Sequence, residues 1–143
     1  MGDDHVKILV VEDHDAVRAQ LCLDLQEAGY QVEEACGGYE ALIRMGEEGH
    51  QIVLTDYHMP GMDGLQFLKI VKVWWPQTPV IFVSGEQLES GRQALDYGAY
   101  AWVPKPWDAY QLLQAVHGAL ELVTCGTGEV SAGTDRGQKP NQV

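Results

Sequence analysis

The sequence predicts an α/β fold in which a parallel sheet of five strands is covered by helices on both faces. Two observations support this prediction. Short apolar runs, rich in branched residues, alternate five times with longer segments of helical period, and the connections between them are short. Most of these runs are apolar throughout, as is typical of strands that are buried on both faces. We therefore expect one domain built from repeated strand–helix units.

Five segments fit the strands of this sheet. They cover residues 8–11, 31–35, 52–54, 80–83 and 101–103. The second segment is more polar than the others and carries two glutamates, which would suit an edge of the sheet. Crossover connections between parallel strands are almost always right-handed, which leaves few strand orders. Among these orders we expect the flavodoxin-like one, 2-1-3-4-5.

Five helices are expected to follow the strands, because apolar residues recur there at helical spacing. They cover residues 17–28, 39–48, 64–75, 86–97 and 113–123. The third ends before Pro76, and its last two residues are Trp74 and Trp75. Adjacent side chains on a helix point about 100° apart, so only one of these two tryptophans is expected in the core.

Composition sets the boundaries and the class of the protein. The chain has 143 residues, enough for one domain with its own core, and 45% of them are hydrophobic. Residues 6–123 are expected to form this domain, after a short tail over 1–5. Residues 124–143 contain several glycines and almost no large apolar side chain, which favours a flexible tail or the start of a linker.

The charge and the remaining composition exclude several classes of function. A formal net charge of -12 argues against direct binding of nucleic acid, which depends on basic residues. No apolar run is long enough to span a membrane, and no signal peptide is evident, so a cytoplasmic protein without a membrane contact is expected. The thiols lack CxxC pairing and are expected to stay reduced: Cys22, Cys36 and Cys125. Four histidines lack metal-binding spacing and are expected to be exposed or packed: His5, His14, His50 and His117.

Polar residues follow four of the five apolar runs at the point where each strand should end. Glu12 and Asp13 come after the first run, Asp56 after the third, Ser84 at the end of the fourth and Lys105 after the fifth. The carboxyl ends of parallel strands lie at one edge of a sheet, where ligands bind. We therefore expect three carboxylates, one hydroxyl and one ammonium group to converge in a single crevice.

The chemistry of such a crevice follows from these residue types. Neighbouring carboxylates raise one another's pKa unless a cation lies between them, and a set of oxygen ligands favours a hard ion such as Mg²⁺. A carboxylate beside a metal ion and a lysine can attack a phosphoryl group to give an aspartyl phosphate. The metal ion, the lysine and a hydroxyl group would then stabilise the charge on the equatorial oxygens.

Several motifs give the sequence a resemblance to the receiver domains of two-component response regulators. The resemblance covers about residues 6 to 123, with the motifs in the same order and at the same spacing. The motifs are Val10-Val11-Glu12-Asp13, the segment from Asp56 to Gly64, Ser84-Gly85, and Gly98-Ala99 followed by Lys105-Pro106. Each one would be a weak signal, but together they are highly specific.

The resemblance implies a role for each residue of the crevice. Asp56 would be the phosphoacceptor and would attack a phosphohistidine on a sensor histidine kinase or a histidine phosphotransfer protein. Asp13 and Asp56 would bind Mg²⁺ directly, together with the backbone carbonyl of His58, and Glu12 would act through water. Asp63 and Gly64 lie outside this set and are better explained as the capped start of a helix.

The resemblance also implies how the phosphoryl group would be held and sensed. Lys105 and Ser84 would each contact a phosphoryl oxygen, and the Lys105–Pro106 peptide bond would be cis. Family members usually have tyrosine or phenylalanine three residues before this lysine, where it forms a switch with the hydroxyl residue. The present sequence has Trp102 there. Because an indole is larger and its N–H needs a partner, we expect a weakened or altered switch.

Two further roles concern the lifetime of the phosphate and the partners. His58 and Glu86 stand at positions that vary in the family and modulate dephosphorylation. Aromatic residues lie on or near the surface that receivers generally use to contact an output domain, a downstream protein or, after phosphorylation, a second receiver. These residues are Tyr97, Tyr100, Trp102 and Tyr110.

Three functions are compatible with the sequence, and we favour a signalling switch. Such a protein is not a turnover enzyme, since it catalyses only its own phosphorylation and slow dephosphorylation. A degenerate receiver that acts only as a protein-binding module is the first alternative, but the complete set of crevice residues argues against it. An aspartate-nucleophile phosphatase is the second. It would generally need another aspartate two residues after the nucleophile, where this sequence has His58.

Overall fold

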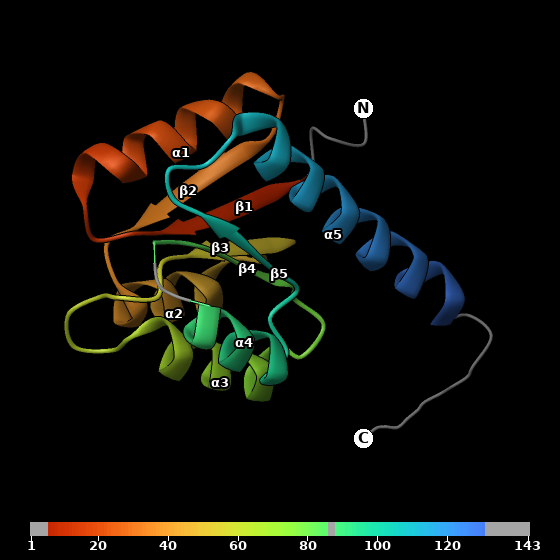
Figure 1. Ribbon diagram of the computed structural model, residues 1–143. Helices are drawn as coiled ribbons and strands as arrows, with labels where there is room; N and C mark the ends of the chain where they lie inside the picture. Colours follow the sequence, from red (N-terminus) through yellow and green to blue (C-terminus); the bar gives the residue numbers. More distant parts are fainter. Residues whose placement is uncertain (1–5, 86–87, 131–143) are drawn as a thin grey trace.

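Strands and helices alternate through the whole described part of the chain (Figure 1). The computed structural model describes residues 6–85 and 88–130. Its elements are β1 (Lys7–Val11), α1 (Asp15–Glu27), β2 (Gln31–Ala35), α2 (Gly38–Glu47), β3 (Ile52–Thr55), α3 (Gly64–Trp74), β4 (Val80–Ser84), α4 (Leu88–Asp96), β5 (Ala101–Pro104) and α5 (Ala109–Val130). All neighbouring strands are parallel, in the order β2-β1-β3-β4-β5. The predicted flavodoxin-like fold and its strand order are confirmed.

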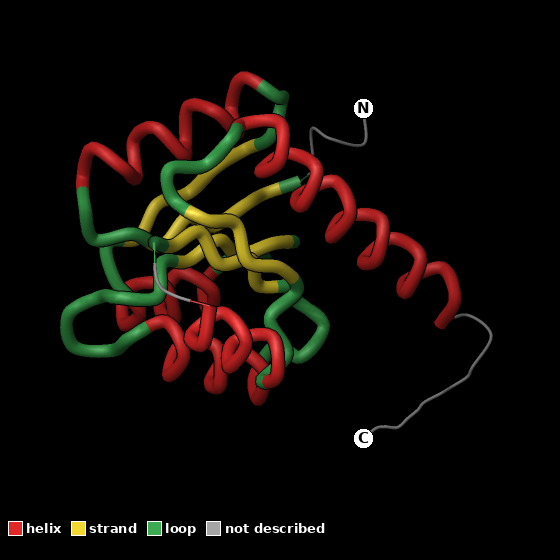
Figure 2. Tube along the Cα trace, in the orientation of Figure 1, coloured by secondary structure: helices red, strands yellow, loops and turns green. Residues whose placement is uncertain are grey.

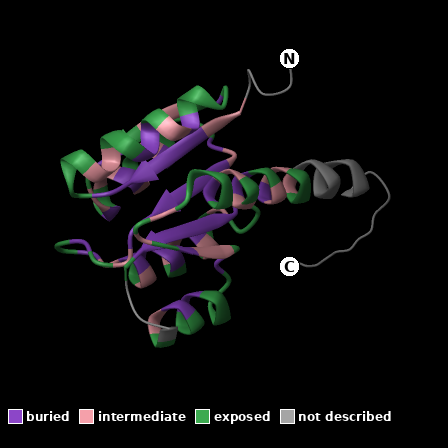
Figure 3. Cartoon of the chain, turned by 45° about the horizontal axis from the view of Figure 1, so that its top comes forward, coloured by how far each residue is buried: buried purple, intermediate pink, exposed green. Residues whose placement is uncertain are grey.

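The sheet separates two hydrophobic cores, because successive side chains of a strand point to opposite faces. Leu9 and Val11 pack with α2, α3 and α4, whereas Ile8 and Val10 pack with α1 and α5. Figure 2 shows the strands between these two groups of helices, and Figure 3 shows that burial is concentrated in the strands and on the inner faces of the helices. Covering both faces explains why the strand sequences are apolar throughout.

β2 is an edge strand, as its polar composition predicted. Its second glutamate, Glu34, is exposed and forms an ion pair with Arg18 of α1. β1 lies in the interior of the sheet, and its residues from Ile8 to Val11 are almost completely buried. The pair of tryptophans at the end of α3 is also divided as predicted, since Trp74 is 72% exposed and Trp75 packs against the core.

The start of α3 explains how the helix is joined to the end of β3. Asp63 is its N-cap: its Oδ1 accepts a hydrogen bond from the Gln66 backbone N–H, and the Gln66 side chain accepts one from the Asp63 N–H. The Gly64 N–H donates to the Tyr57 carbonyl at 2.6 Å. The predicted capped helix start is thus confirmed, and it lies directly against the segment that follows Asp56.

The helix boundaries differ from the predicted ones mainly at α5. This helix begins at Ala109 and continues to Val130, past Val123, where the apolar spacing ends. Apolar spacing records only where a helix is buried, so it does not show how far the helix continues. The proposed limit of the domain at residue 123 stays a prediction, and residues 1–5 and 131–143 lie outside the described part. No helix within the described ranges combines the length and the apolar character that crossing a membrane requires.

Candidate functional site

Residues from three separate segments meet at the carboxyl edge of the sheet. Lys105, which follows β5, donates from Nζ to Glu12 Oε1 at 2.8 Å and to Asp56 Oδ2 at 3.2 Å. Glu12 is 1% exposed and Asp56 is 9% exposed. Glu12, Asp56 and Lys105 therefore converge as expected from the strand ends, and a single ammonium group contacts carboxylates from two neighbouring strands.

The electrostatics of this group are dominated by burial. Burial raises the pKa of Glu12, the hydrogen bond from Lys105 lowers it, and the charge of Asp56 raises it again, so that the pKa lies above its usual value. Burial also lowers the pKa of Lys105, but the hydrogen bond to Glu12 and the charges of Asp56 and Glu12 outweigh it and raise the pKa overall. Lys105 is therefore held in its charged form between the two carboxylates.

Every polar group of Glu12 forms a hydrogen bond with another residue. Its N–H donates to the Ala35 carbonyl at 3.0 Å, and its Oε2 accepts from the His14 N–H at 3.1 Å. Its carbonyl accepts from Arg18 Nη1 at 2.8 Å. Arg18 was not among the predicted site residues. Its sequence signal is weak, because only its position one turn into the helix that follows the acidic pair distinguishes it.

Asp13 completes a group of possible metal ligands. One carboxylate oxygen from each of Glu12, Asp13 and Asp56 can be chosen so that all three atoms lie within 4.8 Å of one another. Oxygen ligands from carboxylates are the donors that Mg²⁺ prefers. Asp13 is exposed, so an ion that binds here can keep water molecules, as Mg²⁺ usually does. The donor set and its exposure therefore fit Mg²⁺.

Ser84 lies at the end of β4, in the strand next to β3, and it is 2% exposed. Its carbonyl accepts a hydrogen bond from the Lys105 N–H at 3.1 Å, which aligns the start of the β5–α5 connection with the end of β4. The Lys105–Pro106 peptide bond is cis, as predicted. Ser84 and Lys105 thus lie side by side at the carboxyl ends of adjacent strands, and a contact of the Ser84 hydroxyl group with the crevice stays a prediction.

Of the two residues expected to modulate dephosphorylation, only His58 lies within the described part of the chain. His58 is exposed, and its ring lies edge-on to Tyr57 with the ring centroids 5.5 Å apart. Glu86 lies outside the described residues. Their roles stay predictions.

Trp102 lies against the core. It stacks on the buried Phe82 ring with a centroid distance of 5.4 Å and an angle of 13°, and its centroid lies 6.0 Å from that of Tyr57. A Cβ atom at Gly91 of α4 would lie only 3.1 Å from the indole. Glycine at this position therefore leaves the space that the larger ring needs, a reason for Gly91 that the sequence pattern did not indicate.

A double-mutant cycle tests this explanation of Gly91. In an ordinary helix, Gly→Ala raises the free energy of unfolding by about 1 kcal/mol. We expect Gly91→Ala to give no such gain in the wild-type chain, because the new methyl group meets the indole, and to give the full gain when Trp102 is replaced by valine. Urea unfolding of the four proteins measures the coupling. Equal gains in both backgrounds would show that the indole does not restrict position 91.

The predicted partner surface is largely exposed. Tyr97, Tyr100 and Tyr110 have exposed fractions of 52%, 38% and 69%, whereas Trp102 is half-buried. Tyr97 also lies under the ammonium group of Lys69, which is 4.4 Å from the ring centroid. Three of the four aromatic residues are thus accessible to another molecule, and their function as an interface stays a prediction.

Comparison with known proteins places this geometry in a family. The family model of the response regulator receiver domain matches residues 8–117. Response regulator MprA of Mycolicibacterium vanbaalenii is 36% identical over 132 residues, which cover 90% of this chain and 57% of MprA. Sensor kinase CckA of Brucella abortus is 40% identical over 117 residues, 80% of this chain and 12% of CckA. The chain therefore spans little more than half of the length of MprA and only a small part of CckA.

Solved structures agree with the sequence comparisons. The receiver domain protein of Clostridium thermocellum has a TM-score of 0.81 and 28% identity, covering 84% of this chain and 98% of that one. Chemotaxis protein CheY4 of Vibrio cholerae has a TM-score of 0.76 and 31% identity, covering 80% of this chain and 98% of CheY4. Together with the strand order and the acidic crevice, these matches show that the chain belongs to the response regulator receiver family of two-component signalling.

Proposed function

We propose that this chain is a phosphorylation-dependent switch in which Asp56 accepts a phosphoryl group. The donor would be a phosphohistidine on a sensor histidine kinase or a histidine phosphotransfer protein. The observation that carries the proposal is the contact of one ammonium group, that of Lys105, with both Glu12 and Asp56 beside the exposed carboxylate of Asp13. This arrangement would supply a nucleophile, a positive charge and a cation site within one crevice.

The proposed reaction assigns one step to each of these side chains. An oxygen of Asp56 attacks the phosphorus atom, the bond from phosphorus to the donor's histidine nitrogen breaks, and the imidazole leaves with that electron pair. Lys105 moves from the carboxylates to a phosphoryl oxygen, and the hydroxyl group of Ser84 donates to another. Glu12, Asp13 and Asp56, with the carbonyl of His58, would hold Mg²⁺, which supplies charge neutralisation when bound.

Phosphorylation would be transmitted through β4, β5 and α4 to the surface that carries Tyr97, Tyr100 and Tyr110. Movement of Ser84 toward the phosphoryl group would change the space next to Trp102, which is already packed between Phe82 and Gly91. An output domain, a downstream protein or a second phosphorylated copy would respond at this surface. His58 and Glu86 would set the lifetime of the phosphate, and the expected site of action is the cytoplasm.

The two alternative functions are less well supported. A receiver that is only a binding module would not need the Lys105 contacts to Glu12 and Asp56, since both place charge in a buried crevice at a cost in desolvation. An aspartate-nucleophile phosphatase would generally need another aspartate two residues after the nucleophile, where this chain has His58. The matched family is also a signalling family.

Intact-mass measurement tests the proposed phosphoacceptor. After incubation with acetyl phosphate, we expect the wild-type chain to gain the mass of one phosphoryl group when Mg²⁺ is present and little or none when EDTA replaces it. Asp56→Asn should gain nothing, because the nucleophilic carboxylate is absent. Asp63→Asn is the matched control: it changes an aspartate that caps α3, and it should be modified like the wild type. Modification of Asp56→Asn, or none of the wild type, would contradict the proposal.

A further inference from the structure

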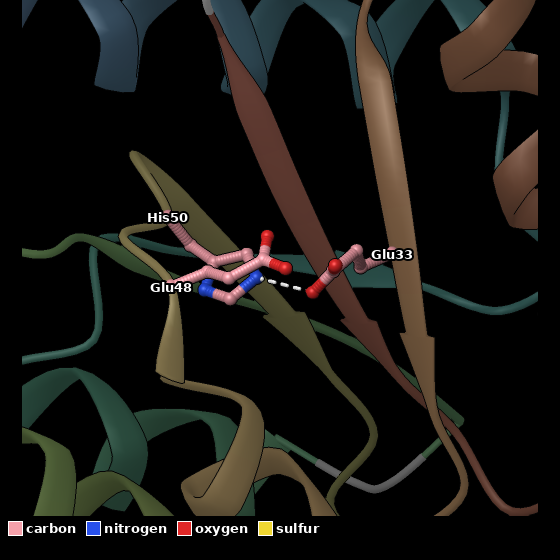
Figure 4. A group of neighbouring side chains, drawn as sticks. All are labelled: Glu33, Glu48 and His50. Atoms are coloured by element: carbon pink, nitrogen blue, oxygen red, sulfur yellow. Dashed lines mark hydrogen bonds and ion pairs between the residues drawn. The ribbon is translucent and has the colours of Figure 1, made fainter. Parts of the chain in front are cut away.

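A second group of possible metal ligands lies away from the phosphorylation crevice (Figure 4). Glu33 is on the edge strand β2, Glu48 follows the end of α2, and His50 lies two residues before the start of β3. One ring nitrogen of His50 and one carboxylate oxygen from each glutamate can be chosen so that all lie within 4.8 Å of one another. Asp56 follows the other end of β3, so the two groups are separated by the length of this strand.

His50 is more deeply buried than its hydrogen bonding explains. Its side chain has no exposed surface, and its Nε2 lies 2.8 Å from Glu33 Oε1. Its Nδ1 is also buried but has no hydrogen-bond partner among the described residues. An unsatisfied buried polar atom costs about 1–3 kcal/mol, so the fold places this ring here at a cost. The contact turns Nε2 toward Glu33, so Nε2 is the nitrogen that an ion bound within this group would meet.

The charges around the ring favour a cation. Glu33 and Glu48 bring two carboxylates, and Lys7 brings the ammonium group that forms an ion pair with Glu48. The hydrogen bond from Lys7 holds the pKa of Glu48 below its usual value, so this carboxylate is anionic. With a neutral imidazole the group has a net charge of about −1. A divalent ion that displaced the partly exposed Lys7 side chain would change this charge to zero.

We infer that Glu33, Glu48 and His50 form a binding site for a divalent transition-metal ion of the zinc type. One nitrogen and two oxygen ligands suit Zn²⁺, whereas Mg²⁺ and Ca²⁺ select oxygen ligands alone. Tetrahedral Zn²⁺ places neighbouring ligand atoms roughly 3.3 Å apart, so His50 Nε2 and Glu33 Oε1, now 2.8 Å apart, would separate slightly to admit the ion. Glu48 can adjust to the ion, because its side chain is 47% exposed. Glu33 then binds the ion directly.

Such an ion would connect three segments of the fold. Glu33 lies on the edge strand β2, Glu48 follows α2, and His50 lies just before β3. Asp56 follows the other end of β3. Because the ion would bind the folded chain and not the unfolded one, it would stabilise the fold by an amount that rises with its free concentration. This effect requires no phosphorylation and does not depend on the proposed function of the crevice.

Calorimetric titration with Zn²⁺ tests the site. The titration uses chains that also carry Asp13→Asn and Asp56→Asn, so that the acidic crevice contributes less. We expect His50→Gln to weaken binding at least about tenfold and Glu33→Gln about as much, as for lost ligands or their orienting partners. Lys7→Met should strengthen binding, because it removes the ammonium group that competes for Glu48. His117→Gln is the matched control, since His117 is an exposed histidine 3.7 Å from Glu121, and it should bind like its parent.

A second measurement does not depend on how the variants fold. Zn²⁺ added to the wild-type chain should shift the imidazole NMR signals of His50 at lower concentrations than those of His117. Shifts of His50 together with weaker binding by His50→Gln would support the site. Unchanged His50 signals, or equal affinities of the parent and His50→Gln, would overturn it and assign the binding to other residues.

Discussion

Lys105→Met is expected to lower the rate of phosphorylation by acetyl phosphate roughly 100-fold, because it removes a preorganised donor to the charge that develops on the phosphoryl oxygens. The same change should lower the free energy of unfolding at pH 7 by about 2 kcal/mol. Breaking a buried ion pair costs more than breaking an exposed one, and Lys105 faces Glu12, which is 1% exposed. Phosphorylation kinetics and urea unfolding measure the two effects.

The pH dependence of this variant provides a second check. The folded-state pKa of Glu12 is already raised, mainly by burial, and the loss of Lys105 raises it further. A carboxyl group with a raised folded-state pKa favours folding when it is protonated, and this contribution is lost as the pH rises through that pKa. The deficit in stability of Lys105→Met should therefore shrink as the pH falls from 7 toward the pKa of Glu12. Lys69→Met, at an exposed lysine, is the control. A deficit that grows with acidification would contradict this explanation.

Gly64→Ala is expected to lower the free energy of unfolding by about 3 kcal/mol, the upper part of the range for overpacking. A Cβ atom here would meet the carbonyl oxygen of Asp56 at a distance that atoms do not tolerate, and would lie 2.8 Å from both the Tyr57 Cα and the Phe82 ring. Backbone atoms cannot turn aside as a side chain can, so the segment after β3 has to shift. Urea unfolding measures the loss, and a lower rate of phosphorylation should accompany it.

Gly46→Ala is the control for this prediction. Gly46 also lies in a helix, and a Cβ atom there would meet nothing within 4 Å. Alanine should therefore stabilise this position by up to about 1 kcal/mol through helix propensity. If Gly64→Ala were as stable as the wild type, the close contact between α3 and the Asp56 segment would not exist in solution.

The sequence predicted the fold and the place of the crevice because both depend on local patterns. Apolar runs that are continuous in sequence showed which strands are covered on both faces, and the polar run identified β2 as an edge. The position of Glu12, Asp56 and Lys105 at strand ends was sufficient to predict that they meet, since parallel strands end at a common edge. The end of α5 was not predictable in the same way, because its residues past Val123 lack the apolar spacing that marks a buried helix face.

Three contacts outside the strand ends were not predicted. Arg18 supports Glu12 through a backbone carbonyl, which leaves no pattern of residue types. Glycine generally weakens a helix, whereas the structure shows that Gly91 makes room for Trp102. His50 was expected to be exposed or packed. It is packed, but its approach to Glu33 depends on the fold, since the two residues are 17 positions apart.

The way in which Glu12 is held has a consequence for the entropy of ligand binding. Fixing the backbone of one residue costs about 1–2 kcal/mol, and a glutamate side chain adds up to about 2 kcal/mol. Here Ala35, Arg18, His14 and Lys105 restrict the backbone and both carboxylate oxygens of Glu12 when the chain folds. A cation that enters the crevice does not have to order this residue again. Its affinity is set instead by the exchange of water molecules and of the Lys105 ammonium group for the ion.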